Sequence, residues 1–208
     1  MSSRGRFISL EGGEGVGKST QVRALAEALK SRGLDVLVTR EPGGSEGAEA
    51  IRELLLSGAD NRWGAHAEAL LFAAARADHV DKTIEPALEA GRWVISDRFV
   101  DSSLAYQGGA GGLGIEAVRE INAFAVRGRF PERTLVLTAE DGAERARARD
   151  ADGSDRIGGR SADYHHKVDT AFRLIAIEEP ERVVMVDATG TEEQVTQRLL
   201  EAIADLLP

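Results

Sequence analysis

The run Gly12-Gly13-Glu14-Gly15-Val16-Gly17-Lys18-Ser19-Thr20 has the residue types and the spacing of a phosphate-binding loop. In this pattern, backbone N–H groups and the N-terminus of the following helix surround the α and β phosphates of a nucleotide. Lys18 should reach the β and γ phosphates, and the hydroxyl of Ser19 should bind Mg²⁺. An apolar run precedes the loop, and apolar residues at helical spacing follow it. The sequence therefore predicts a nucleotide site at residues 12–20.

Three later segments place arginines where they could hold phosphate. Arg40 follows the second apolar run, in Thr-Arg-Glu-Pro-Gly-Gly, and a guanidinium suits bidentate contact with phosphate oxygens, although a surface arginine fits this segment equally well. Phe72 and Arg76 are four residues apart and share a helix face, where the ring could stack on a base or pack in the core. Asp97 and Arg98 end a third apolar run, where they could orient Mg²⁺-bound water and bind phosphate, or pair with each other.

The elements that must position these residues alternate between strand and helix. Apolar strand-like runs at 6–10, 34–39, 92–96, 134–138 and 182–187 are separated by segments of helical pattern, which is typical of an α/β fold with a parallel sheet. Ligands of such sheets bind beyond the carboxyl ends of the strands. Thr191 with Gln194, and Asp141 with Glu144, resemble capping pairs at helix starts. The glycines of Gly108–Gly114 indicate a loop. Helices are expected at 18–31, 45–57, 66–90, 101–107, 115–127, 141–150, 161–178 and 192–206.

Composition narrows the class of protein. The 208 residues, 42% of them hydrophobic, suffice to bury a core, and we expect one domain over 1–208. A net charge of −9 argues against nucleic acid as the main partner, so local arginines must bind anionic substrates. The chain has no cysteine, which excludes disulfides and thiolate chemistry. Neither an apolar leader nor a run long enough to span a bilayer is visible, so we expect a cytoplasmic protein without membrane association.

Nearly the whole chain resembles the thymidylate kinases, which phosphorylate dTMP with ATP. The resemblance depends on the segments FISLEGGEGVGKST, TREPGG, LLFAAAR, SDRFVDSSLAYQGG and RARARDADGSDRI. It implies a P-loop kinase fold: a five-stranded parallel sheet flanked by helices, with a small mobile lid at about 144–160. It also implies ATP as phosphoryl donor, Mg²⁺ as cofactor and a homodimer, for which the apolar segment 67–77 is a candidate contact face.

The resemblance assigns an acceptor site residue by residue. Phe72 would stack on thymine, Arg76 would bond the base edge, and Ser103 would lie beside the base. Tyr106 would contact the deoxyribose and disfavour a 2′-hydroxyl, and Gln107 would line the same pocket. The residues expected around the acceptor phosphate are Arg40, Arg52, Arg98 and, near its Mg²⁺ or water shell, Glu11.

An acid in the phosphate loop, here Glu14, marks the bacterial subtype in which the lid supplies the catalytic arginine. We expect Arg149 to be that residue and Arg156 to be a second lid contact with ATP. The expected catalytic set is completed by Lys18, Glu14 and Arg98. The expected metal site consists of Ser19 and of Asp97, which would act through water.

Two other functions remain compatible with the pattern. One is a P-loop kinase for another deoxynucleotide or for a deoxynucleoside. The other is a non-catalytic nucleotide-binding module, although such a module has no need for the second pocket with its aromatic and arginine residues.

Overall fold

In the computed structural model, residues 4–59, 62–139 and 160–208 are described, and five of their strands form one parallel sheet in the order β2-β3-β1-β4-β5. This confirms the predicted sheet. Because β1 is the central strand, the chain that leaves its carboxyl end lies in the middle of the ligand-binding edge. The strands are β1 (Phe7–Gly12), β2 (Val36–Arg40), β3 (Trp93–Asp97), β4 (Arg133–Thr138) and β5 (Val183–Asp187).

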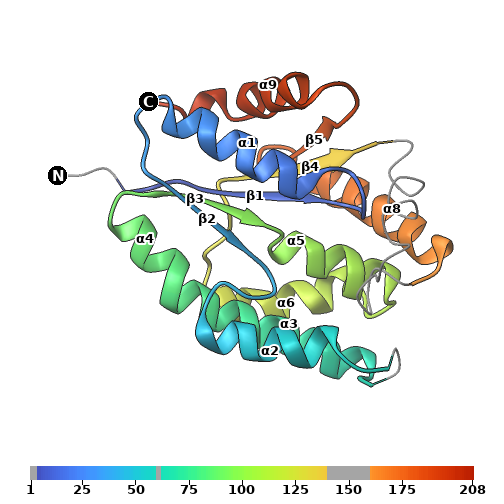
Figure 1. Ribbon diagram of the computed structural model, residues 1–208. Helices are drawn as coiled ribbons and strands as arrows, with labels where there is room; N and C mark the ends of the chain where they lie inside the picture. Colours follow the sequence, from blue (N-terminus) through green and yellow to red (C-terminus); the bar gives the residue numbers. More distant parts are fainter. Residues whose placement is uncertain (1–3, 60–61, 140–159) are drawn as a thin grey trace.

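Helices cover both faces of the sheet (Figure 1). Side chains of β1 alternate between two cores: Phe7 packs among the helices of one face, whereas Ile8 and Leu10 pack against α1 and α9 on the other. The first face carries the predicted acceptor residues. The helices are α1 (Lys18–Lys30), α2 (Glu46–Leu56), α3 (Ala65–His79), α4 (Glu85–Glu89), α5 (Val100–Ser103), α6 (Ile115–Val126), α8 (Ala162–Glu178) and α9 (Glu192–Ala202).

The helix expected over 66–90 is continuous but not uniform. Between α3 and α4 the chain winds as a π-helix over Val80–Ile84. Pro86 lies in the first turn of α4 and has no N–H for the carbonyl one turn earlier, so a wider turn accommodates it.

The loop expected at Gly108–Gly114 begins later than predicted. α5 continues as a π-helix over Leu104–Ala110. Gly108 and Gly109 act here as close-packing residues, because a Cβ on Gly109 would lie 2.6 Å from the Cβ of Ala171 in α8. Tyr106 and Gln107 therefore sit on a helical segment pressed against α8.

The Thr191–Gln194 capping box at the start of α9 is confirmed. The Asp141–Glu144 pair and the helix expected at 141–150 lie outside the described residues. Among the helices that the structure describes, none is long and apolar enough to cross a membrane.

Candidate active site

The chain leaves β1 through the phosphate-binding loop and enters α1 at Lys18. Gly12 has a φ of +133°, and a Cβ there would lie 2.4 Å from the carbonyl oxygen of Leu137, so only glycine fits. Gly17, at φ +90°, precedes the first helical residue. No acidic side chain lies in the first turn of α1, so its unpaired N–H groups are available to an anion.

Lys18 is buried, and its Nζ donates to the carbonyl oxygens of Gly12 (3.1 Å) and Gly13 (2.5 Å). Burial lowers the pKa of Lys18 to about 8, and the charge of Arg98 adds to this effect against the nearby carboxylates. A cation is thus held inside the loop at neutral pH, and it loses its proton when the pH rises above about 8.

The hydroxyl of Ser19 donates to Oδ2 of Asp97 at 2.9 Å, where β3 ends beside α1. Within the described ranges, no group of three or more His, Cys, Asp or Glu side chains could hold a metal ion. Mg²⁺ in nucleotide sites needs no such group, because phosphate oxygens and water fill most of its coordination positions. A hydroxyl and a carboxylate at the loop are therefore suitable oxygen donors for Mg²⁺.

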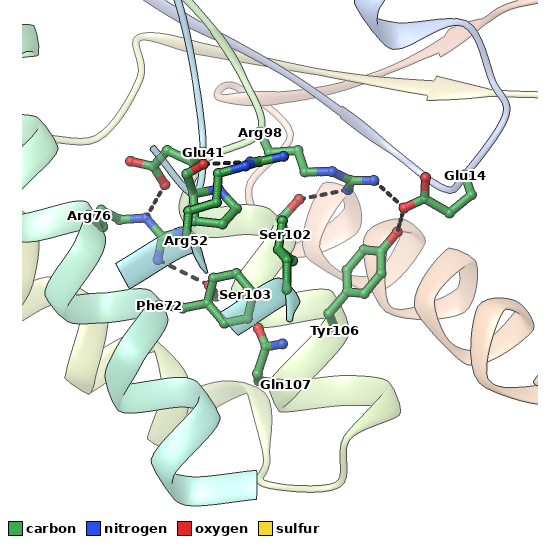
Figure 2. A pocket seen from close by; sticks show the side chains of 12 residues that line it. Glu14, Glu41, Arg52, Phe72, Arg76, Arg98, Ser102, Ser103, Tyr106 and Gln107 are labelled. Atoms are coloured by element: carbon green, nitrogen blue, oxygen red, sulfur yellow. Dashed lines mark hydrogen bonds and ion pairs between the residues drawn. The ribbon is translucent and has the colours of Figure 1, made fainter. Parts of the chain in front are cut away.

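Next to the loop lies a cavity that is open to solvent (Figure 2). It brings together residues from the loop, the segment after β2, α2, α3 and the chain after β3, and eight of them were predicted site residues. The lining consists of Glu14, Glu41, Pro42, Arg52, Leu56, Phe72, Arg76, Arg98, Ser102, Ser103, Tyr106 and Gln107.

Arg98 joins the cavity to the loop. Its guanidinium donates to Glu14 Oε1 (2.6 Å), to the Gly12 carbonyl oxygen (3.2 Å) and to Ser102 Oγ (3.1 Å), and it lies 5.1 Å from the ring centre of Tyr106. Arg98 has a φ of +71°, a left-handed conformation that is costly for a residue with a Cβ. Such strain is characteristic of functional sites, where it fixes the direction of a side chain.

Glu14 also accepts a hydrogen bond from the hydroxyl of Tyr106 at 3.2 Å. Burial alone would raise the pKa of Glu14, but Arg98 and Lys18 outweigh it and the pKa falls below its ordinary value. Burial raises the pKa of Tyr106, so that its hydroxyl stays protonated and donates. The loop carboxylate is therefore an anion between two cations.

Glu11 lies behind Arg98 and is not one of the described residues that line the cavity. The carboxylate accepts from the Phe99 N–H and from the Ser102 hydroxyl, both at 2.6 Å. Burial, together with the charge of Asp101, raises the pKa of Glu11 to about 7. Its contacts hold the segment that carries Arg98 and Ser102.

The buried guanidinium of Arg76 is already well bonded. It donates to Glu41 Oε2 (2.6 Å), Ser103 Oγ (3.0 Å) and the Phe99 carbonyl oxygen (3.0 Å), and also to Asn122. These bonds use four of its five N–H groups, so one Nη2 hydrogen remains. Arg76 is therefore held rigidly at the wall of the cavity.

The two remaining arginines differ in position. Arg52 lines the cavity and donates to the Pro42 carbonyl oxygen at 2.6 Å. The side chain of Arg40 is 57% exposed, pairs with Glu49 at 3.0 Å, and is not part of the described cavity lining. Its contact with the acceptor phosphate stays a prediction. Arg149 and Arg156 lie outside the described residues.

Sequence reasoning assigned no role to Glu41, Ser102 or Glu68. Glu41 follows Arg40 in the quoted TREPGG segment, pairs with Arg76 and contacts His79 Nδ1 at 2.9 Å. Glu68 precedes Phe72 by one helical turn and accepts from Gln107. The helical spacing of Glu68 and Phe72 was the available signal; nothing local in the sequence pairs Glu41 with Arg76.

Known proteins resemble this chain over nearly its whole length. A sequence model of the family described as thymidylate kinase matches residues 10–199. The thymidylate kinase of Rhizorhabdus wittichii is 61% identical over 206 residues, which cover 98% of this chain and 99% of that protein. The thymidylate kinase of Bradyrhizobium diazoefficiens is 47% identical over 211 residues, which cover 100% of this chain and 92% of that protein. The crystal structure of thymidylate kinase from Ehrlichia chaffeensis matches with a TM-score of 0.80 at 27% identity, over 96% of this chain and 99% of that one.

Proposed function

The chain belongs to the thymidylate kinase family, and from this membership we propose how its own residues transfer the γ-phosphoryl group of ATP to dTMP. It is an ATP-dependent nucleoside monophosphate kinase. The observation that carries the proposal is a cavity with an aromatic and arginine lining that touches the phosphate loop through Glu14. The whole chain acts as one kinase domain in this proposal.

On the donor side, the loop amides and the α1 N-terminus bind the phosphates of ATP. Lys18 contacts the β and γ phosphates and stabilises the negative charge that develops on the transferring group. Phosphoryl transfer depends mostly on position and charge stabilisation, so this arrangement needs no covalent intermediate. Bound Mg²⁺ supplies further charge neutralisation on the phosphates. Ser19 and, through water, Asp97 are the residues that would hold it.

On the acceptor side, dTMP occupies the cavity with its base between Phe72 and the π-helix that carries Tyr106 and Gln107. Arg76, with Ser103 beside it, meets the base edge through its remaining N–H. The dTMP phosphate is already ionised, so it needs no general base. The groups that hold it are Arg52 and Arg98, with Arg40 nearby and Glu11 and Ser102 supporting Arg98.

The family resemblance adds the lid at about 144–160, with Arg149 as the catalytic arginine and Arg156 as an ATP contact. Arg149→Ala should lower kcat more than it weakens dTMP binding. A variant that loses only dTMP affinity would assign Arg149 to the acceptor site instead.

A homodimer is the proposed assembly. Leu70 lies in segment 67–77 of α3 and is 56% exposed; Phe124, on the adjoining helix α6, is 88% exposed. Phe124→Glu should reduce the mass measured by analytical ultracentrifugation; an unchanged mass would place the interface elsewhere. The proposed location is the cytoplasm.

The decisive experiment is a coupled ADP-release assay across dTMP, dUMP, UMP, dCMP and AMP. dTMP should be the preferred acceptor, and Lys18→Ala should reduce turnover by at least about a hundredfold, the cost typical of one lost charge-stabilising donor. Wild-type protein that ignores dTMP in the presence of ATP and Mg²⁺ would overturn the proposal.

A further inference from the structure

Glu68 is a carboxylate whose side chain is only 4% exposed, beside the base-binding end of the cavity. It lies on α3, one turn before Phe72, and therefore on the same helix face. Nε2 of Gln107 donates to its Oε1 at 3.1 Å. Gln107 lines the cavity, whereas Glu68 does not belong to the described lining and lies behind it.

Arg160 fixes the role of this carboxylate. Its Nη2 lies 3.0 Å from Oε1 and 2.8 Å from Oε2 of Glu68. A guanidinium can only donate, and an ionised carboxylate can only accept. Glu68 is thus bound as an acceptor, and it can pair with the Gln107 amide only through the NH₂ group.

Arg160 is itself well anchored. It donates to the hydroxyl of Tyr164 and lies 4.6 Å from the centre of that ring. The Tyr164 hydroxyl donates in turn to the carbonyl oxygen of Tyr106 at 2.7 Å. The chain of contacts closes on the π-helix that carries Gln107, so Glu68 and Gln107 are held in one rigid unit.

The amide oxygen of Gln107 is left for the cavity. In Figure 2 this oxygen points toward Phe72 and the nitrogen points away from it. A glutamine free to turn its terminal amide could offer either an oxygen or an NH₂ group to a base at little cost. Because one N–H of the NH₂ group is bound to Glu68, the amide cannot exchange the places of its oxygen and nitrogen, and the oxygen stays on the side of Phe72.

Thymine and cytosine present opposite hydrogen-bonding edges. Thymine has an N3–H donor beside its C4 carbonyl, whereas cytosine has an N3 acceptor beside its C4 amino group. An amide oxygen pairs with N3–H of thymine but meets the lone pair of cytosine N3. A buried acceptor facing another acceptor costs the desolvation of both, which is how sites built for one hydrogen bond reject its analogue.

We propose that Glu68 is a positioning residue that holds the Gln107 amide with its oxygen toward the acceptor base, and that this restricts the enzyme to pyrimidines carrying N3–H. The inference rests on the proposed position of dTMP in the cavity. Glu68 acts through Gln107 and touches no reacting atom.

The test compares dTMP with 5-methyl-dCMP, which keeps the 5-methyl group and changes only the N3 and C4 edge. In Glu68→Gln the new amide can donate to Gln107 and allow it to turn. The ratio of kcat/KM for dTMP to that for 5-methyl-dCMP should fall about tenfold or more, equivalent to about 1.4 kcal/mol. The change should appear in the KM for the acceptors, while the KM for ATP stays constant.

Gln107→Leu provides the second variant. It removes the oxygen, so it should lower the same ratio by itself, and adding Glu68→Gln to it should produce no further change, because the effect passes through Gln107. The matched control is Glu89→Gln, an exposed glutamate at the end of α4.

A merely structural role for Glu68 gives a different result. The variant would then melt earlier and lose activity toward both nucleotides equally, with the ratio unchanged. An unchanged ratio in folded Glu68→Gln, or in Gln107→Leu, overturns the inference while wild-type activity on dTMP leaves the proposed function intact.

Discussion

Arg98 and Glu14 connect the two halves of the site through one ion pair, with Nη2 2.6 Å from Oε1. Glu14 belongs to the phosphate loop, which follows β1. Arg98 follows β3, the strand beside β1 in the sheet. Because the same guanidinium also donates to the Gly12 carbonyl oxygen and to Ser102, it lies between the donor loop and the acceptor cavity. In the proposed reaction, the charge of Arg98 would act on both the donor and the acceptor phosphate groups.

Arg98→Lys should reduce kcat/KM for dTMP by about a hundredfold, because a single ammonium group cannot keep the three directed contacts of the guanidinium. Steady-state kinetics with dTMP as the varied substrate measures this effect. Arg32→Lys, an exposed arginine after α1, is the matched control and should stay within twofold of wild type. Kinetics of Arg98→Lys equal to those of the control would remove Arg98 from the acceptor site.

We expect Lys18 to make the use of ATP sensitive to alkaline pH. Its pKa of about 8 in the free protein means that it is charged below pH 8 and loses its proton as the pH rises further. Since kcat/KM follows the protonation of the free enzyme, kcat/KM for ATP should fall above pH 8, up to tenfold per pH unit. Lys18→Arg keeps its charge and should lose this alkaline limb, whatever its absolute rate. A flat wild-type profile to pH 9.5 would contradict the assignment.

Glu11 should make the fold less stable as the pH rises. Burial raises its pKa from 4.5 to about 7 in the folded protein, so the folded state binds more protons than the unfolded state between these values. This stabilisation is fully present below pH 4.5 and is lost as the pH rises through 7. It is on the order of 3 kcal/mol, since the pKa rises from 4.5 to about 7 and one pKa unit corresponds to about 1.4 kcal/mol.

Urea unfolding at several pH values tests this dependence. Glu11→Gln cannot titrate, so its free energy of unfolding, relative to wild type, should increase between pH 5 and pH 7.5. Parallel pH profiles for the two proteins would show that Glu11 has no raised pKa.

The sequence predicted those parts of the site that depend on local pattern. Gly12 to Ser19 need only their own spacing and the adjoining strand and helix, and Phe72 and Arg76 need only a helical repeat. The Glu41–Arg76 pair could not be predicted, because it joins residues 35 positions apart, and their meeting depends on the tertiary fold that brings the segment after β2 to α3. The role of Glu68 could not be predicted either, because its partners Gln107 and Arg160 are distant in the sequence and meet it only in the folded protein.

The glycines after Tyr106 show a second limit. Gly108 and Gly109 favour a loop by local rules, yet the chain there remains helical as far as Ala110. The reason is a tertiary contact with α8: glycine is required there because a side chain would collide with α8, not because the chain turns. Composition alone does not distinguish these two uses of glycine.

That contact supplies the last prediction. Gly109→Ala places a Cβ 2.6 Å from the Cβ of Ala171, and neither atom belongs to a flexible side chain, so the π-helix and α8 must separate. Overpacking of this kind costs about 1–3 kcal/mol of unfolding free energy. Because Gln107 lies two residues away, the KM for dTMP should also rise severalfold, with little change in the KM for ATP. Gly64→Ala is the control, since no atom lies within 4 Å of its added Cβ. If Gly109→Ala matches this control in urea unfolding and in dTMP kinetics, close packing against α8 does not position the base-binding residues.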